Sequence, residues 1–289
     1  MRKRISESNL FPAFNLFEEY RKIEMIISEA TIVGTYSQFG TPLIPAYTLE
    51  QYINDLYFRG WNLRGTFVSI ADMRNGLGIA KAMLTDKSIA EERVLDFLQY
   101  AANLWLRING TIRSCTTAYI SDRDNYLIML IQNITALTNR LGAELKLDKA
   151  KSEIYLVYKD AVSFAVAEEH PDISESIIEY RKLDNRGDLQ RKGEVLCTLY
   201  KKLEAYGERF KGTTYEGLYK DTTFLFNKTG ARHWVEKDKI ACETFLKMKP
   251  DELEDWYDKT FELFLTCMVI CSYLDIREDI GAVKRVELR

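Results

Sequence analysis

The helical spacing of apolar residues constrains this chain more than any other feature. Apolar side chains recur at intervals of three and four residues across 94–108 and again across 251–275. This spacing places a continuous apolar stripe on one face of an α-helix. We find no stretch with sustained strand alternation and no internal repeat of 20–50 residues. The chain is therefore predicted to be all-α.

The length and composition favour two helical domains. The 289 residues are 46% hydrophobic and 29% charged, as in ordinary globular proteins. Only five prolines and fifteen glycines are present, which leaves room for long helices because both residues are costly inside them. We predict an N-terminal helical domain over 1–148 and a C-terminal helical bundle over 149–289. The polar segment 146–150 is the predicted joint.

Local signals place elements in the N-terminal half. Residues 34–45 contain two glycines and two prolines and are predicted to form a loop. Thr48 with Gln51, and Ser88 with Glu91, fit capping boxes at helix starts. The glycine-rich stretch 59–80 fits a kinked helix pair or a tight turn. Other predicted helices span 12–31, the residues after Ser88 up to Asn109-Gly110, and about 124–145.

The C-terminal half reads as a succession of amphipathic helices. His170-Pro171 and Gly187 are predicted breaks between them. The predicted helices span about 149–169, 172–185, 188–206, 214–228 and 251–275.

Charge, hydropathy and cysteine usage exclude several classes of protein. The net charge of −3 argues against a nucleic-acid coat protein, although 201–249 has eleven Lys/Arg against seven Asp/Glu, which permits an anionic partner. The longest apolar run, 263–274, is shorter than the ~20 residues that span a bilayer. Five scattered cysteines without CxxC and two histidines fit no zinc motif. We expect a cytoplasmic protein with no membrane partner, no metal and no cofactor.

The segment 221–236 gathers the residues best suited to chemistry. His233 could take and give protons near neutral pH, and Arg232 beside it could hold a phosphate. Asn227, six residues earlier, could orient either group. The alternative is a plain helix C-terminus, capped by Gly230, where Arg232 and His233 stabilise the last carbonyls. Spacing alone favours this structural interpretation.

Three runs carry a family resemblance. They are EIYLVYKDAVSFAVAEEHPDISESIIEYRKLDNRGDLQRKGEVLCTLYKKLE, then LFNKTGARHW, then ELEDWYDKTFELFL. Over roughly 149–280 the chain resembles the C-terminal domain of bacterial abortive-infection proteins, within the broader HEPN group. The resemblance implies a small α-helical bundle that often dimerises. It also implies metal-independent ribonuclease activity in phage defence or as a toxin.

The resemblance transfers to particular residues only in part. Asn227 fits the polar residue, Gly230 the spacer glycine and His233 the histidine of the family motif. Phe226 stands where the motif's first arginine is expected. Either Arg232 substitutes for that arginine or the site is catalytically inactive. Lys228 and Lys237 are expected to contact RNA.

Two functional hypotheses from different classes follow. In the first, the protein is an RNA-cleaving effector, and a homodimer through the C-terminal bundle brings two loops together. In the second, it is a non-catalytic helical module that binds RNA or a protein partner. In the first hypothesis the N-terminal domain is expected to sense a partner protein or to restrain the activity.

Other candidates have simpler structural interpretations. His170 is expected to cap a helix, and Cys267 with Cys271 to pack in a core. The acidic cluster of 251–258 fits a solvated helix start. The basic residues around Gly187 fit a solvated loop better than an RNA track; they are Arg181, Lys182, Arg186, Arg191 and Lys192.

Overall fold

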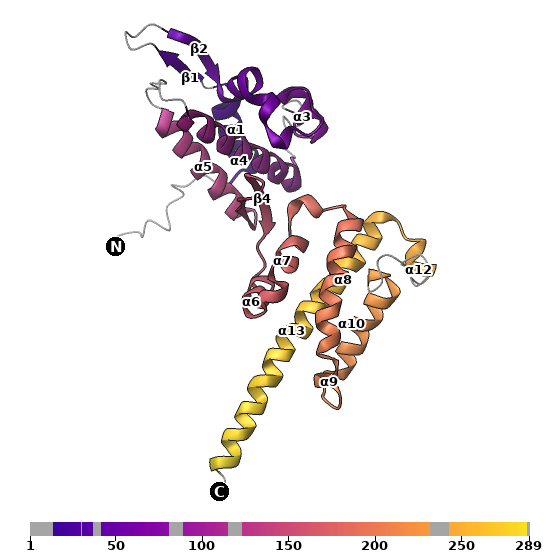
Figure 1. Cartoon of the computed structure of the whole chain (residues 1–289). Coiled ribbons are helices and arrows are strands. Elements are labelled where there is room, and N and C mark those ends of the chain that lie inside the picture. The colour runs from indigo at the N-terminus through magenta and orange to yellow at the C-terminus, as the bar shows by residue number, and fades with distance from the viewer. Residues whose placement is uncertain are drawn as a thin grey trace, which may run out of the picture. The chain divides into compact units, whose positions relative to one another are not determined.

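The computed structural model describes residues 14–29, 31–36, 42–80, 89–114, 123–231 and 243–287. The chain divides into two compact units, Met1–Leu156 (unit 1) and Val157–Arg289 (unit 2). Helices dominate both units, which confirms the predicted fold class (Figure 1). The strands among the described residues form two small two-stranded sheets that the sequence did not reveal.

The division between the units falls inside a β-hairpin. Strand β3 (Ala143–Asp148) pairs with β4 (Glu153–Tyr158) across a connection too short for a parallel crossover. Asn103 also fixes β4, since its amide donates to the Ile154 carbonyl at 2.6 Å and accepts from the Ile154 N–H at 2.8 Å. Residues 149–156 therefore stay with unit 1, beyond the boundary predicted at 148.

Unit 1 is built around three main helices, α1, α4 and α5. Large side chains such as Tyr20, Phe97 and Tyr100 are almost completely buried in its core. Its elements are α1 (Leu16–Ser28), β1 (Thr31–Tyr36), β2 (Pro42–Thr48), α2 (Leu49–Tyr52), η2 (Ile53–Tyr57), η3 (Phe58–Gly60), η4 (Asn62–Arg64), α3 (Ile70–Gly76), α4 (Glu91–Ser114), α5 (Arg123–Arg140), β3 and the first part of β4.

A charged network lies inside unit 1. Arg74 is 5% exposed and Glu24 is 3% exposed, and two of their nitrogen–oxygen pairs are 2.8 and 2.9 Å apart. Arg74 also lies 2.9 Å from Glu50, to which the Tyr100 hydroxyl donates at 2.8 Å. Burial raises the pKa of Glu50 against the opposing attraction of Arg74. The network joins α1, α2, α3 and α4 through buried and half-buried hydrogen bonds.

Two predictions in unit 1 are wrong and one is confirmed. The predicted loop 34–45 overlaps the antiparallel strands β1 and β2, because Gly and Pro there mark strand ends and register irregularities. Helix α4 continues past Gly110 to Ser114, because buried Ile108 and Thr111 hold both sides of the glycine. Thr48 and Gln51 form the predicted capping box.

Three other predictions in unit 1 have mixed outcomes. Helix α5 ends at Arg140 rather than near 145, since Gly142 adopts a positive φ of 72° before β3. The glycine-rich stretch 59–80 forms short helical turns and α3. The second capping box cannot be compared, because Ser88 lies outside the described residues.

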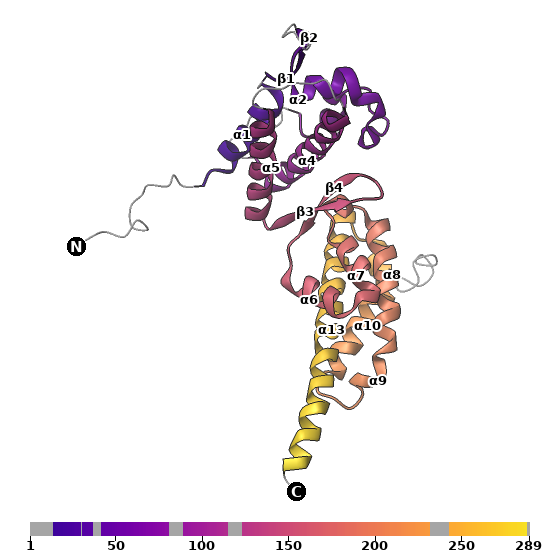
Figure 2. The same ribbon diagram turned by 60° about the vertical axis from the view of Figure 1, so that its left-hand side comes forward.

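Unit 2 is a helical bundle that α13 traverses (Figure 2). Its core is formed by apolar faces of α6, α7, α8, α10 and α13, including Leu199, Phe226, Tyr257 and Phe264. Its helices are α6 (Ala161–Glu169), α7 (Pro171–Tyr180), η6 (Leu183–Asn185), α8 (Leu189–Ala205), α9 (Gly207–Phe210), α10 (Glu216–Lys228), α12 (Glu243–Leu246) and α13 (Pro250–Glu287).

Most helix predictions for unit 2 are confirmed, with two corrections. Helices α8 and α10 match the predictions 188–206 and 214–228 closely. The predicted helix 149–169 is wrong in its first half, where the apolar run of 153–158 forms β4. Helix α13 has 38 residues and continues well beyond the predicted end at 275.

Ring stacking and polar contacts hold α13 against α7 and α8. The ring of Tyr180 stacks on that of Phe261 with centroids 4.0 Å apart, and its hydroxyl donates to Asp258 at 2.8 Å. Lys192, which is 7% exposed, lies 2.7 Å from both Glu254 and Asp258. These contacts fix α7 and α8 against the first half of α13.

Candidate functional site at the end of helix α10

Helix α10 ends where the sequence places the candidate site. The N–H of Thr229 donates to the Leu225 carbonyl at 2.9 Å, and the N–H of Gly230 donates to the Asn227 carbonyl at 3.4 Å. Gly230 has a φ of +80°, in the left-handed region that favours glycine at a helix end. The predicted helix end at Gly230 is confirmed.

The end of α10 is anchored in the core of unit 2. The Phe226 side chain is completely buried, and its ring centroid lies 5.1 Å from that of Tyr200 and 6.5 Å from that of Phe264. Thr229 and Ala231, on either side of Gly230, are 2% and 0% exposed. The bundle therefore fixes the point from which the Arg232–His233 dipeptide continues.

The structure describes only two of the five candidate residues. Asn227 is half-buried in the last turn of α10. Lys228 is exposed, and its ammonium lies 5.9 Å from the centroid of the Phe224 ring. Arg232, His233 and Lys237 lie outside the described residues. The structure thus places Asn227 and Lys228 next to each other and leaves the proposed triad untested.

The burial of Phe226 bears directly on the family motif. The motif's first arginine would fall on a side chain that is packed among Tyr200 and Phe264. A guanidinium there would be buried in apolar surroundings without a partner, which is costly. This position therefore contributes packing, and any phosphate-binding cation must come from another residue.

The next described element along the chain, α12, packs against α13. Helix α12 begins at Glu243, and its Phe245 side chain is 9% exposed. The Phe245 ring meets that of Trp256 on α13 edge to face, with centroids 5.5 Å apart. The Phe245 side chain thus anchors α12 against α13.

The electrostatics at this helix end favour cations. The last carbonyls of an α-helix carry partial negative charge, which attracts Lys, Arg and protonated His. Lys228 lies in that last turn. A phosphate at the end of α10 would be repelled by the same carbonyls, so its binding would depend on basic side chains of the segment.

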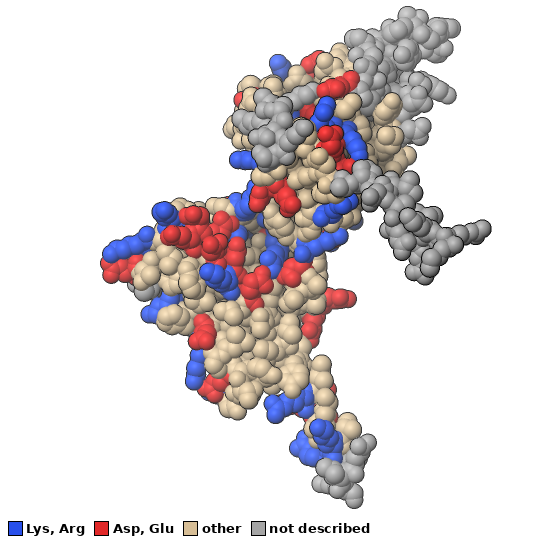
Figure 3. All heavy atoms as spheres, turned by 180° about the vertical axis from the view of Figure 1, so that it is seen from behind, with Lys and Arg blue, Asp and Glu red and all other residues tan. Residues whose placement is uncertain are grey.

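The basic residues around Gly187 are largely paired within the protein. Arg181 lies 2.7 Å from Asp160 and 2.5 Å from Glu262. Arg191 bridges Glu179 at 2.9 Å and Glu194 at 3.3 Å. On the face shown in Figure 3, the coloured acidic and basic side chains over the bundle are interspersed. This pairing argues against an RNA track. The predicted solvated loop is nevertheless wrong for Arg191 and Lys192, since both lie on α8 and Lys192 is buried.

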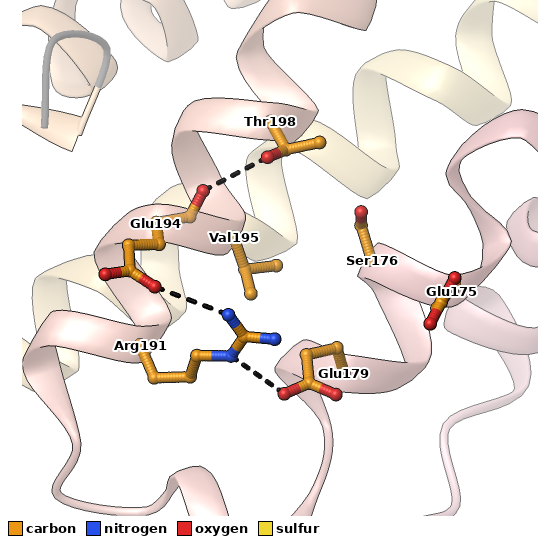
Figure 4. A pocket seen from close by; sticks show the side chains of 7 residues that line it. All are labelled: Glu175, Ser176, Glu179, Arg191, Glu194, Val195 and Thr198. Atoms are coloured by element: carbon orange, nitrogen blue, oxygen red, sulfur yellow. Dashed lines mark hydrogen bonds and ion pairs between the residues drawn. The ribbon is translucent and has the colours of Figure 1, made fainter. Parts of the chain in front are cut away.

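A shallow hollow of about 180 Å³ lies between α7 and α8 (Figure 4). Its lining residues are Glu175, Ser176, Glu179, Arg191, Glu194, Val195 and Thr198. Burial opposes ionisation of Glu179, but hydrogen bonds from Lys182, Arg191 and Asn185 outweigh it and lower its pKa to about 2. The Arg191 guanidinium is held by carboxylates on both sides, so the hollow offers little attraction to an anion.

His170 is the histidine that the structure describes. It lies between α6 and α7, where its N–H donates to the Val166 carbonyl at 2.9 Å, which confirms the predicted helix end. Its ring lies 6.2 Å from that of Tyr206, and burial lowers its pKa. The nearby cations Lys202 and Arg209 pair with Asp172 and Asp275. Both cations are therefore already paired with carboxylates, so neither is available to hold an anionic ligand beside His170.

The cysteine pair of α13 has a structural role. Cys267 and Cys271 are 0% and 1% exposed inside the core of unit 2, as predicted. Burial raises the pKa of the Cys271 thiol to about 12, which keeps it protonated and unreactive near neutral pH.

Across the described parts of the chain, no cluster of three or more His, Cys, Asp or Glu residues is arranged to hold a metal ion.

Comparisons with known proteins add no relative. No family model matches the chain, and neither a curated protein nor a solved structure shows significant similarity to it. In the described residues, no helix has the length and apolar character needed to cross a membrane.

Proposed function

We propose that unit 2 is an abortive-infection effector domain that binds and cleaves RNA at the end of α10 without a metal. The observation that supports this most is the anchored helix end. Phe226 and Ala231 are buried on either side of Asn227, Lys228 and Gly230. A site needs side chains held by a rigid scaffold, and this arrangement supplies one for the start of the Arg232–His233 segment.

The proposed chemistry uses three side chains. His233 would take the proton of a ribose 2′-hydroxyl, whose oxygen then attacks the adjacent phosphorus. The bond from phosphorus to the 5′-oxygen breaks, and His233 returns a proton to that leaving oxygen. Arg232 would hold the phosphate and Asn227 would orient the reacting groups. The products are a 2′,3′-cyclic phosphate and a 5′-hydroxyl.

The proposal also includes two lysines that contact RNA and a second copy of the chain. Lys228 and Lys237 would pair with RNA phosphates and offset the partial negative charge of the helix end. A homodimer of unit 2 would bring two such segments to one RNA. Unit 1 would bind a partner protein that controls the activity, as expected for a cytoplasmic phage-defence protein.

A second candidate function is favoured by the burial of Phe226. The arginine that the family motif requires has no place at this completely buried position. Unit 2 would then be a catalytically inactive helical module that binds RNA or a protein partner through the same segment. It would need the basic side chains of this segment but not the proton transfer by His233.

The experiment uses the purified full chain with single-stranded RNA, and follows both binding and cleavage. The variants are His233→Ala and, as a matched control, His170→Ala at the other histidine. Cleavage by wild type and His170→Ala, but not by His233→Ala, supports the effector. Binding by all three without cleavage supports the inactive module. A wild-type protein that neither binds nor cuts RNA contradicts both RNA-dependent proposals.

A further inference from the structure

The second half of α13 carries apolar side chains that the bundle does not cover. Five of them are 45–59% exposed, a large fraction for residues of this type. Between Asp275 and Arg285, every residue other than Gly281 is exposed. Figures 1 and 2 show this part of α13, in yellow, continuing beyond the other helices of unit 2. The five apolar residues are Val269, Tyr273, Ile276, Ile280 and Val283.

The spacing of these residues is that of a coiled-coil seam. Successive members are separated by four, three, four and three residues, which is the heptad repeat of alternating a and d positions. Tyr273 and Ile280 occupy a positions, while Val269, Ile276 and Val283 occupy d positions. Such a repeat keeps one stripe facing a partner helix as the two helices wind around each other.

The seam lies on the outer side of α13. At the level of Val269 the same helix is packed into the bundle through buried Cys267 and Cys271. Tyr273, which is 45% exposed, meets the Tyr215 ring edge to face with centroids 6.1 Å apart. A partner helix can therefore lie along the seam without displacing the core of unit 2.

Little tertiary packing stabilises the exposed end of α13. A helix of about 12 residues without tertiary contacts is only marginally stable in water. The part of α13 from Ile276 to Glu287 has this length. Pairing along the seam would bury its apolar stripe and stabilise it in the helical state.

The flanking charges identify a second copy of this chain as the occupant. Beside the seam, Asp279 occupies a g position, and Arg277 and Lys284 occupy e positions. In a parallel pair, each g residue faces the e residue of the following heptad on the other helix. Asp279 of one copy would then face Lys284 of the other. In an antiparallel pair, the basic e positions would face each other.

We propose that two copies of this chain associate through a parallel, two-stranded coiled coil formed by 269–283 of α13. This surface deepens the homodimer of the proposed function, but it is argued from the seam and its charges, independently of any RNA chemistry. Basic and acidic residues are mixed on the polar side, whereas helices that bind anionic lipid carry mainly Lys and Arg there. A lipid surface is thus the weaker match.

The main test measures the mass of the full chain in solution over a wide range of protein concentrations. Wild type should dimerise reversibly, and Ile276→Asp combined with Ile280→Asp should raise the dimer Kd more than about tenfold. Ala282→Asp, on the same exposed helix but off the seam, should leave the Kd unchanged. Circular dichroism verifies that unit 2 stays folded, since all three positions are exposed.

Charge variants test the orientation. Asp279→Lys and Lys284→Asp should each weaken a parallel dimer, and the two changes together should restore it. Strengthening by Lys284→Asp alone would indicate antiparallel pairing and overturn the parallel arrangement.

Three other results would overturn the proposal. They are a monomeric wild type at every concentration, a dimer unaffected by the double isoleucine variant, and a monomer that uses the seam to bind phosphatidylserine vesicles. A wild-type protein that dimerises through the seam but does not cleave RNA would count against the proposed function and not against the coiled coil.

Discussion

The ring of Phe226 lies 5.1 Å from the ring of Tyr200, inside the core of unit 2. Phe226 is also the position where the abortive-infection resemblance expects an arginine. Replacing it with arginine should therefore unfold unit 2 rather than create activity. We expect Phe226→Arg to destabilise the protein by about 4 kcal/mol or more, because it buries an unpaired charge.

Urea unfolding of the full chain checks this prediction. Phe226→Leu is the matched control, because an apolar replacement of similar size should cost less than about 1.5 kcal/mol. A Phe226→Arg variant with wild-type stability and new ribonuclease activity would show that this position belongs to the site and not to the core.

The fold class and the long helices could be predicted from the sequence, because their apolar residues follow one helical period. Helices α8 and α10 end close to the predicted positions. The glycine at position 230 indicates the end of α10, because glycine favours the left-handed conformation found there. The hairpins were missed for two physical reasons. Strand β4 is a short apolar run, which periodicity cannot distinguish from a helix. Strands β1 and β2 are held by pairing with each other rather than by an alternating pattern.

The candidate site could be predicted only as a set of residue types. The sequence placed Asn227, Arg232 and His233 in one segment, but it could not show that Phe226 is a core residue. Nor could it show that Lys192 is buried between Glu254 and Asp258. These partners are more than 60 residues away in the chain, so only tertiary structure brings them together.

Gly230 should be sensitive to substitution because of its backbone conformation. At a φ of +80° a Cβ atom is strained, so Gly230→Ala is expected to lower the free energy of unfolding by more than about 1 kcal/mol. Gly217, in the first turn of the same helix α10, is the matched control. A Cβ at Gly217 meets no atom within 4 Å, so Gly217→Ala should raise that free energy by roughly 0.4–1 kcal/mol. Equal effects of the two changes in urea unfolding would contradict the assigned helix end.

Arg74 should be among the most sensitive charged residues of unit 1. Its removal leaves the buried Glu24 and the half-buried Glu50 without their cation, so Arg74→Ala is expected to cost about 3–5 kcal/mol. Lys22→Ala breaks an exposed pair with Glu19 and should cost less than about 1 kcal/mol. Thermal unfolding monitored by circular dichroism distinguishes the two. Similar melting temperatures for both variants would show that the buried network adds little.

Glu179 should make unit 2 sensitive to acid. Its pKa is about 2 in the folded protein and 4.5 in its ordinary state, so folding favours the charged form. The resulting stabilisation is fully present above pH 4.5 and is lost as the pH falls from 4.5 towards about 2. Glu179→Gln removes this contribution, so the difference in stability between wild type and variant should be largest above pH 4.5 and shrink below it. Urea unfolding at a series of pH values measures this difference. Glu208→Gln, at an exposed pair with Lys211, is the control and should show no such trend. A difference for Glu179→Gln that is constant from pH 7 to pH 3 would mean that the hydrogen bonds from Lys182, Arg191 and Asn185 do not favour the charged carboxylate.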